Sequence, residues 1–188
     1  MNTLYASVSV SDSLGNLLFY SQGMSVYNRN HLVMPNGNGL RGDQNTQGVF
    51  VVKKPGSYNL FFLFTIYNSI MPISYGLYYS LVDMNLNGGL GDVVSGFKNI
   101  PVVGGEDVVN GIHGTRHFNN QDAWIVVRKT TTNQYGAYRI TSSGISSTPV
   151  LSSCSVAGCG FNSCGLVELK ISQDGTKYVF ISNNPQLN

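Results

Sequence analysis

Apolar side chains in this sequence recur at every second position, and no segment shows the 3.6-residue period of an amphipathic helix. The alternation is clearest over residues 57–67, 75–84 and 123–130. Turn residues such as Pro55-Gly56 separate the alternating stretches at intervals of about 8–12 residues. Many short strands with this spacing are typical of a β-sandwich or barrel, so we predict an all-β fold. A length of 188 residues suits a single domain over residues 1–188.

The segment from Ser57 to Tyr67 restricts the fold further, because it is apolar on both faces. Neighbouring residues of a strand point to opposite sides, and a sheet with one solvated side is polar on that side. We expect one face to lie in the sandwich core and the other to lie at a subunit contact or under a second layer. The predicted core face consists of Tyr58, Phe62 and Phe64. The predicted interface consists of Phe61, Leu63 and Tyr67.

Other parts of the chain carry stronger turn signals. Residues 28–48 are rich in Asn and Gly and include Pro35, so we predict the longest irregular stretch there. Residues 165–172 and 177–182 alternate again and flank the turn sequence Gln173-Asp174-Gly175-Thr176, which predicts a hairpin.

Charged residues make up only 11% of the chain, and the formal net charge is +2. Basic residues are scattered, with Lys53-Lys54 and Arg128-Lys129 as adjacent pairs. A nucleic-acid-binding protein of this size would show a basic stripe with interleaved aromatics, so we expect no nucleic-acid partner. No apolar run approaches the ~20 residues of a membrane helix, so we expect no membrane insertion. Residues 1–5 lack the basic and apolar regions of a signal peptide, so we expect that such a peptide is absent or has been removed.

Residues 48–60 read Gly-Val-Phe-Val-Val-Lys-Lys-Pro-Gly-Ser-Tyr-Asn-Leu. This segment resembles the C1q-domain signature, in which a Gly-x-Phe strand leads through Pro-Gly into Tyr-x-Phe. Leu60 stands where that family usually has Phe, and residues 122–126 resemble a later family strand more loosely. The resemblance implies a C1q and tumour-necrosis-factor-like jelly roll, which usually forms a compact trimer. We therefore expect a jelly-roll β-sandwich of about 8–10 strands, an architecture that also builds viral spikes and capsids.

Two short motifs have both a functional and a structural interpretation. Arg41-Gly42-Asp43 could be an adhesion loop for an integrin-type receptor, although Gly and Asp are also common turn residues. His113 and His117 have a spacing that could bind a metal on a helix. Gly111 and Gly114 argue against a helix, so we expect a loop contact or pH-sensitive packing there.

The remaining candidates do not define a catalytic or metal site. Cys154, Cys159 and Cys164 are odd in number, which leaves one local disulfide or three free thiols as alternatives. Glu106-Asp107 could help to hold Ca²⁺, but a solvated loop fits the sequence better. No Gly-x-Ser-x-Gly elbow and no phosphate-binding loop occurs, and no carboxylate pair is marked by its context. We expect no enzyme activity, no cofactor and no metal.

These features together favour a structural protein. Few charges, abundant Asn, Ser and Gly, and a strand that is apolar on both faces predict a virion capsid or spike component. Its expected partners are copies of itself, as a homotrimer, and other structural proteins of the particle. One alternative is a secreted or cell-surface C1q-like trimer that binds a receptor or glycan. Another is a β-sandwich carbohydrate-active enzyme, for which two facing carboxylates would be needed.

Overall fold

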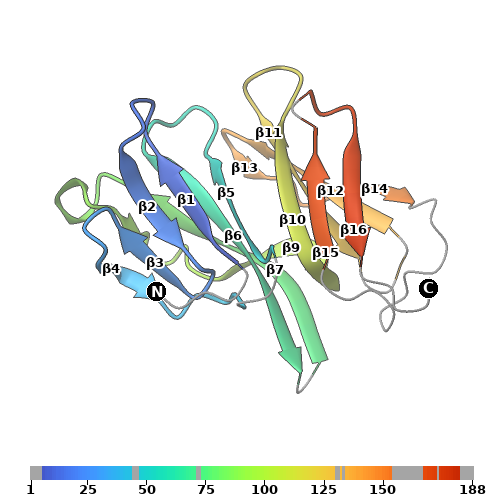
Figure 1. The fold of residues 1–188 in the computed structure, drawn as a ribbon, viewed down its shortest axis with the longest axis horizontal. Helices are drawn as coiled ribbons and strands as arrows, with labels where there is room; N and C mark the ends of the chain where they lie inside the picture. The colour runs from blue at the N-terminus through green and yellow to red at the C-terminus, as the bar shows by residue number, and fades with distance from the viewer. Residues whose placement is uncertain are drawn as a thin grey trace.

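A computed structural model describes residues 6–43, 47–70, 73–129, 132, 134–153, 167–172 and 174–182. These residues form sixteen β-strands and one three-residue 3-10 turn, Asn87–Gly89, with no α-helix among them (Figure 1). The all-β prediction is confirmed, although the strands outnumber the predicted 8–10. No helix in this part of the chain has the length and apolar character needed to span a membrane.

The strands form four antiparallel sheets, which we name A to D. Sheet A has the order β1 (Val8–Ser11), β2 (Leu17–Ser21), β3 (Ser25–Asn28), β4 (Val33–Asn38). Sheet B has the order β5 (Val49–Lys53), β6 (Leu60–Ile70), β7 (Ile73–Asp83), β8 (Asp92–Val93), and β9 (Ile100–Glu106) also pairs with β7. Sheet C has the order β10 (Val108–Arg116), β11 (Ala123–Lys129), β12 (Gln134–Thr141), β13 (Gly144–Ile145), and β14 (Val150–Ser153) also pairs with β12. Sheet D is the hairpin of β15 (Val167–Ile171) and β16 (Tyr178–Ser182).

Strands that are close in sequence pair with each other in all four sheets. Among the described strands, only the pairs β7–β9 and β12–β14 skip a strand. A jelly roll instead needs Greek-key connections, which place strands from distant parts of the chain side by side. The described pairings contain no such connection, so the structure supports a β-sandwich and does not confirm a jelly roll.

Sheet B carries an apolar core on each face, because sheets A and C cover it from opposite sides (Figure 1). Phe62 and Phe64 face sheet C and pack with Ile125 and Tyr138, as predicted for the sandwich core. Phe61 faces sheet A, where its ring meets Phe19 edge-on with the centroids 5.4 Å apart. β6 is apolar on both faces because it belongs to sheet B, the middle layer of three.

The second apolar face of β6 lies under a layer of the same chain. Phe61 exposes 4% of its surface and Leu63 none, so these two side chains leave no area for a second subunit. Of the two alternatives for this face, the subunit contact is wrong for Phe61 and Leu63, and the second layer is correct. Tyr67 is half-buried and meets the Tyr78 ring edge-on at 6.5 Å.

Tyr58 is 88% exposed, which contradicts its predicted place in the core. The strand begins only at Leu60, because residues 54–59 form the turn between β5 and β6. In this turn the Ser57 hydroxyl oxygen accepts hydrogen bonds from the backbone N–H groups of Asn59 and Leu60. The period-two pattern therefore does not extend back to Tyr58, whose ring lies beside Lys53 instead.

Two regions that we predicted to be irregular contain strands. Residues 28–48 include β4, the edge strand of sheet A, where Pro35 is tolerated because an edge strand has one unpaired side. The loop expected around His113 is instead part of β10, which spans Val108–Arg116 despite Gly111, whose φ of +113° lies within a shift of register between Val109 and Ile112. Glycine makes this β-bulge possible because it alone adopts that φ without strain.

Candidate ligand-binding groove

A groove of about 550 Å³ lies between sheets B and C, near the turn after β5 and the loop after β10. Both connections lie at the top of Figure 1. Its volume is within the range of about 300–1,000 Å³ that is usual for small-ligand sites. The two walls are about 60 residues apart in sequence, so only the packing of the sheets brings them together.

The floor of the groove is aromatic and depends on a glycine. The Phe50 ring lies 2.5 Å from the point that a Cβ of Gly114 would occupy, so only glycine lets β5 approach β10 this closely. Trp124 lines the same groove and is half-buried. Its ring stacks on His117 with the centroids 5.6 Å apart.

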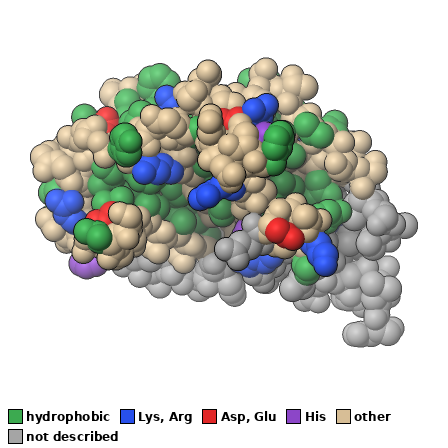
Figure 2. All heavy atoms as spheres, turned by 90° about the horizontal axis from the view of Figure 1, so that it is seen from above, with side chains coloured by type: hydrophobic (Ala, Val, Ile, Leu, Met, Phe, Trp, Pro, Cys, Tyr) green, Lys and Arg blue, Asp and Glu red, His purple; other side chains and the backbone are tan. Residues whose placement is uncertain are grey.

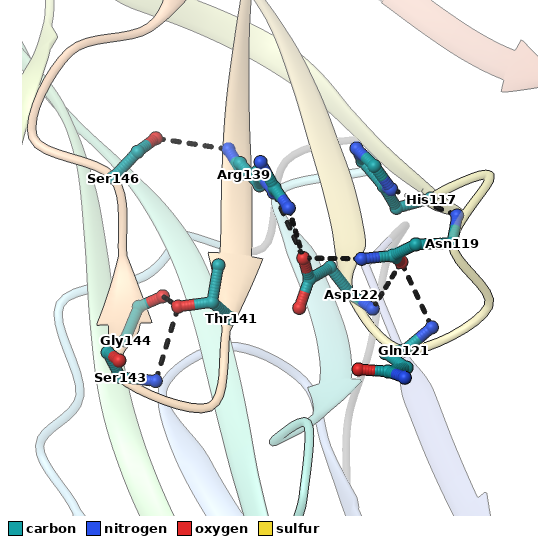
Figure 3. A network of polar contacts seen from close by, with 9 residues as sticks. All are labelled: His117, Asn119, Gln121, Asp122, Arg139, Thr141, Ser143, Gly144 and Ser146. Atoms are coloured by element: carbon teal, nitrogen blue, oxygen red, sulfur yellow. Dashed lines mark hydrogen bonds and ion pairs between the residues drawn. The ribbon is translucent and has the colours of Figure 1, made fainter.

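One wall is the loop 117–122, which a hydrogen-bond network holds in place (Figure 3). The Asn119 side-chain oxygen accepts from the backbone N–H groups of Gln121 (3.0 Å) and Asp122 (2.9 Å). Nδ1 of His117 accepts from the backbone N–H of Asn119 at 3.1 Å. These contacts fix the loop, while the side chains of Asn120 and Gln121 stay exposed and line the groove.

Asp122 is the one carboxylate that lines this groove, within the described residues. Its Oδ2 accepts hydrogen bonds from Arg139, with the shorter at 2.6 Å, and from the Asn119 amide at 2.9 Å. The Arg139 and Asn119 contacts hold the pKa of Asp122 below its ordinary value of 3.8. A glycosidase needs two carboxyl groups across its substrate, and this groove offers one that is already paired.

Three cations line the groove and give it a positive surplus. They are Lys53, Lys54 and Arg116. Lys53 is exposed and lies 5.6 Å from the Tyr58 ring centroid. The side chains of Lys54 and Arg116 have no hydrogen-bond or ion-pair partner among the described residues. Figure 2 shows lysine and arginine side chains (blue) along the middle of this face, among mostly uncharged surface.

Sequence reasoning missed this groove. It noted Lys53-Lys54 only as an adjacent pair and did not connect it with Arg116. The available signal was a basic pair directly before the Pro55-Gly56 turn, because turns between strands present their flanking side chains at the rim of a sandwich. No feature of the sequence indicates that Arg116 lies across the groove from Lys53 and Lys54.

The Arg41-Gly42-Asp43 segment packs against the body of the protein. The Arg41 guanidinium donates to the Tyr78 hydroxyl at 3.2 Å and lies 5.2 Å from that ring. Gly42 is so close to Gly23 that an added Cβ would lie 2.1 Å from the Gly23 carbonyl oxygen. This packing favours the interpretation as a structural turn over that as an adhesion loop.

His113 and His117 do not converge on a metal. His113 lies within β10 and His117 follows its end, so four residues of extended chain, about 13 Å, separate them. His113 is half-buried beside Phe50, and its Nδ1 has no hydrogen-bond partner among the described residues. The described residues contain no group of three or more His, Cys, Asp or Glu side chains placed to hold a metal. Cys154, Cys159 and Cys164 lie outside these residues.

The Glu106-Asp107 segment is held by a lysine. Lys129 Nζ donates to the backbone carbonyl oxygens of Gly104 and Glu106, the latter at 2.9 Å. Those oxygens are the type of ligand that Ca²⁺ prefers, and here an ammonium group occupies them. The geometry fits a structural loop.

Comparison with known protein families, with curated proteins and with solved structures finds no match to this chain. The similarity of residues 48–60 to the C1q signature therefore stays a prediction. The β5–β6 hairpin has the Pro-Gly turn that the signature implies, but Tyr58 points to solvent.

Proposed function

We propose that this protein is a non-enzymatic structural component of a larger assembly, namely a capsid or spike protein of a virion. The observation that carries the proposal is a pair of exposed apolar edge strands on a surface with few charges. The trimer predicted from the C1q resemblance remains part of the proposal, but the buried face of β6 gives it no support.

The first edge strand is β14, whose four residues are all exposed. It pairs with β12 along one side, and the described residues place no strand along its other side. Val150 and Leu151 expose 57% and 51% of their surface. An exposed apolar edge strand is a template for pairing with another chain, which monomeric proteins usually protect with charge or a bulge.

The second edge strand is β16. Tyr178 and Val179 expose 54% and 60% of their surface, and β15 is the one described strand that pairs with β16. Both edges belong to the half of the molecule formed by sheets C and D (Figure 1). Apolar side chains that gather along strand edges are typical of surfaces that another protein covers.

The test is the molecular mass of the protein in solution, measured by light scattering across a concentration series. The assembly proposal predicts a mass above the 20.4 kDa of one chain. Leu151→Lys together with Val179→Lys should shift the mass towards one chain, because a lysine on an edge strand opposes pairing. Leu14→Lys is the matched control, since Leu14 is 86% exposed in the turn between β1 and β2. A wild type that stays a single chain at every concentration would overturn the proposal.

A second candidate function is a secreted or cell-surface protein that binds a receptor or glycan. The groove between sheets B and C favours it, because the side chains of Lys54 and Arg116 there have no hydrogen-bond or ion-pair partner within the described part of the chain. The two candidates are compatible, since the groove and the exposed edge strands involve different residues.

A further inference from the structure

We propose that the groove between sheets B and C binds an anionic saccharide, a sugar chain that bears sulfate or carboxylate groups. Lys54 and Arg116 would bind the acidic groups, and Asn120 and Gln121 the hydroxyls. This inference rests on the ligand-binding function given above as the second candidate, and it does not depend on assembly.

The charge of the groove selects an anion. Three of the eleven Lys and Arg residues of the chain line it, and the one carboxylate there is neutralised by Arg139. Lys54 and Arg116 come from opposite walls, on the β5–β6 turn and on β10. A ligand with acidic groups along its length could therefore contact both at once. Hydrogen bonds in which one partner is ionised are about twice as strong as neutral ones.

The uncharged side chains of the groove suit a ligand rich in hydroxyl groups. Asn120 and Gln121 each offer an amide that donates and accepts, and Ser57 adds a hydroxyl. The Phe50 ring adds apolar aromatic surface at the floor of the groove. A single-stranded nucleic acid would instead need successive aromatic platforms along a basic track.

The wall that carries the two amides is rigid before any ligand arrives. Asn119 holds the backbone of Gln121 and Asp122, and His117 holds the backbone of Asn119 (Figure 3). A wall that is already ordered loses little conformational entropy when the ligand binds. The groove therefore has the fixed shape expected of a site that distinguishes one sugar from another.

The test titrates a heparin-derived hexasaccharide into the full chain and follows the fluorescence of Trp124, the single tryptophan. We expect saturable binding that changes this fluorescence, and about tenfold weaker binding in Lys54→Ala and in Arg116→Ala. Arg29→Ala removes the same charge from the exposed turn between β3 and β4 and should leave the affinity unchanged. Far-UV circular dichroism confirms that each variant is folded.

Single-stranded DNA and a second hexasaccharide without acidic groups distinguish saccharide recognition from simple attraction of a polyanion. Gln121→Ala should weaken binding of the hexasaccharide but not of single-stranded DNA of matched charge, because a simple polyanion does not need the amide. DNA that binds as tightly, with the same dependence on Lys54, Arg116 and Gln121, would overturn the proposal in favour of a general polyanion site. A neutral hexasaccharide, with neither sulfate nor carboxylate groups, that binds equally well would overturn the anionic preference and leave the second candidate function intact. Absence of binding to both hexasaccharides would overturn this proposal and the glycan form of the second candidate function.

Discussion

Leu63 provides a test of whether sheet A or a second subunit covers the second apolar face of β6. Its side chain is fully buried between sheets A and B. We predict that Leu63→Ala lowers the free energy of unfolding by about 2–5 kcal/mol, because a cavity remains in a packed core. Denaturant unfolding measures the loss, and light scattering should show the same mass as the wild type. A Leu63→Ala variant that keeps its stability but changes its molecular mass in solution would instead support a subunit contact at Leu63.

His113 is the residue whose protonation should affect stability near neutral pH. Burial, and secondarily the charge of Lys170, lower the pKa of His113 below its ordinary value of 6.5. The unfolded chain therefore binds a proton at a pH where the folded chain does not. The contribution of neutral His113 to the stability of the fold is fully present above pH 6.5. It is lost progressively as the pH falls towards the pKa of His113 in the folded protein.

We predict that an NMR titration of the His113 ring gives a pKa below 6.5, and that the melting temperature falls as the pH drops beneath that value. His113→Gln should flatten this part of the pH profile, because the amide does not titrate. His31→Gln is the control, since His31 is exposed next to Tyr20 on the far side of sheet A. A His113 pKa at or above 6.5 would show that its ring is more solvated than the structure indicates.

At the scale of elements, the β15–β16 turn depends on one carboxylate. Asp174 Oδ1 accepts a hydrogen bond from the Ser172 hydroxyl at 2.5 Å, and Thr176 adds two more. The Ser172 contact, followed by those of Thr176, lowers the pKa of Asp174 from 3.8 to about 2. The carboxylate therefore stabilises the turn above pH 3.8, and this contribution disappears as the pH falls towards about 2.

We predict that Ser172→Ala raises the pKa of Asp174 towards 3.8, since it removes the largest cause of the shift. Carbon-detected NMR titration of the carboxyl group measures this directly. Ser143→Ala is a matched control in the β12–β13 turn, far from this contact in sequence. An unchanged Asp174 pKa would mean that the hydroxyl does not donate to the carboxylate in solution.

Strands with many apolar residues were predictable, and strands rich in glycine were not. The alternation over β6 reveals both the strand and its two buried faces, because six consecutive positions from Phe61 to Ile66 are buried. β4 contains Pro35 and Gly37, and β10 contains Gly111 and Gly114, so their local preference opposes a strand. Pairing with the neighbouring strands β3 and β11 overrides that preference, and a composition rich in Gly and Pro does not reveal this pairing.

The candidate site was less predictable than the fold. The Lys53-Lys54 pair and the Pro55-Gly56 turn are visible in the sequence as a basic turn. The opposite wall, with Arg116 and Gln121, belongs to β10 and the turn after it, where the sequence predicted a loop contact around His113 and His117. Only the stacking of sheet C on sheet B brings the two walls together, and that arrangement follows from burial on both faces of β6.

For the whole molecule, polar contacts reinforce the apolar cores between the layers. The Tyr138 hydroxyl of sheet C donates to the Gly104 carbonyl of β9 at 2.5 Å, and burial raises the pKa of Tyr138 to about 12. On the other side, the backbone N–H of Asn36 in sheet A donates to Asp92 of sheet B at 2.8 Å. Sheet B is thus tied to both neighbours by part-buried hydrogen bonds.

This arrangement predicts that the protein unfolds as one unit. β6 supplies Phe61 and Leu63 to one core and Phe62 and Phe64 to the other, so neither core persists when the strand is lost. Phe19→Ala opens a cavity in the core between sheets A and B and should cost about 3–5 kcal/mol. Trp124 lies on the opposite side, in sheet C, and reports the other half of the molecule.

In a cooperative molecule, the Phe19→Ala substitution should shift the denaturant midpoint seen by Trp124 fluorescence as far as the midpoint seen by far-UV circular dichroism. Tyr58→Ala is the control, because Tyr58 is 88% exposed and its loss should move neither midpoint appreciably. The result that would contradict this prediction is a Trp124 transition that stays in place while circular dichroism shows a separate, earlier step. Sheet A would then unfold on its own, and the chain would consist of two domains that share a boundary at sheet B.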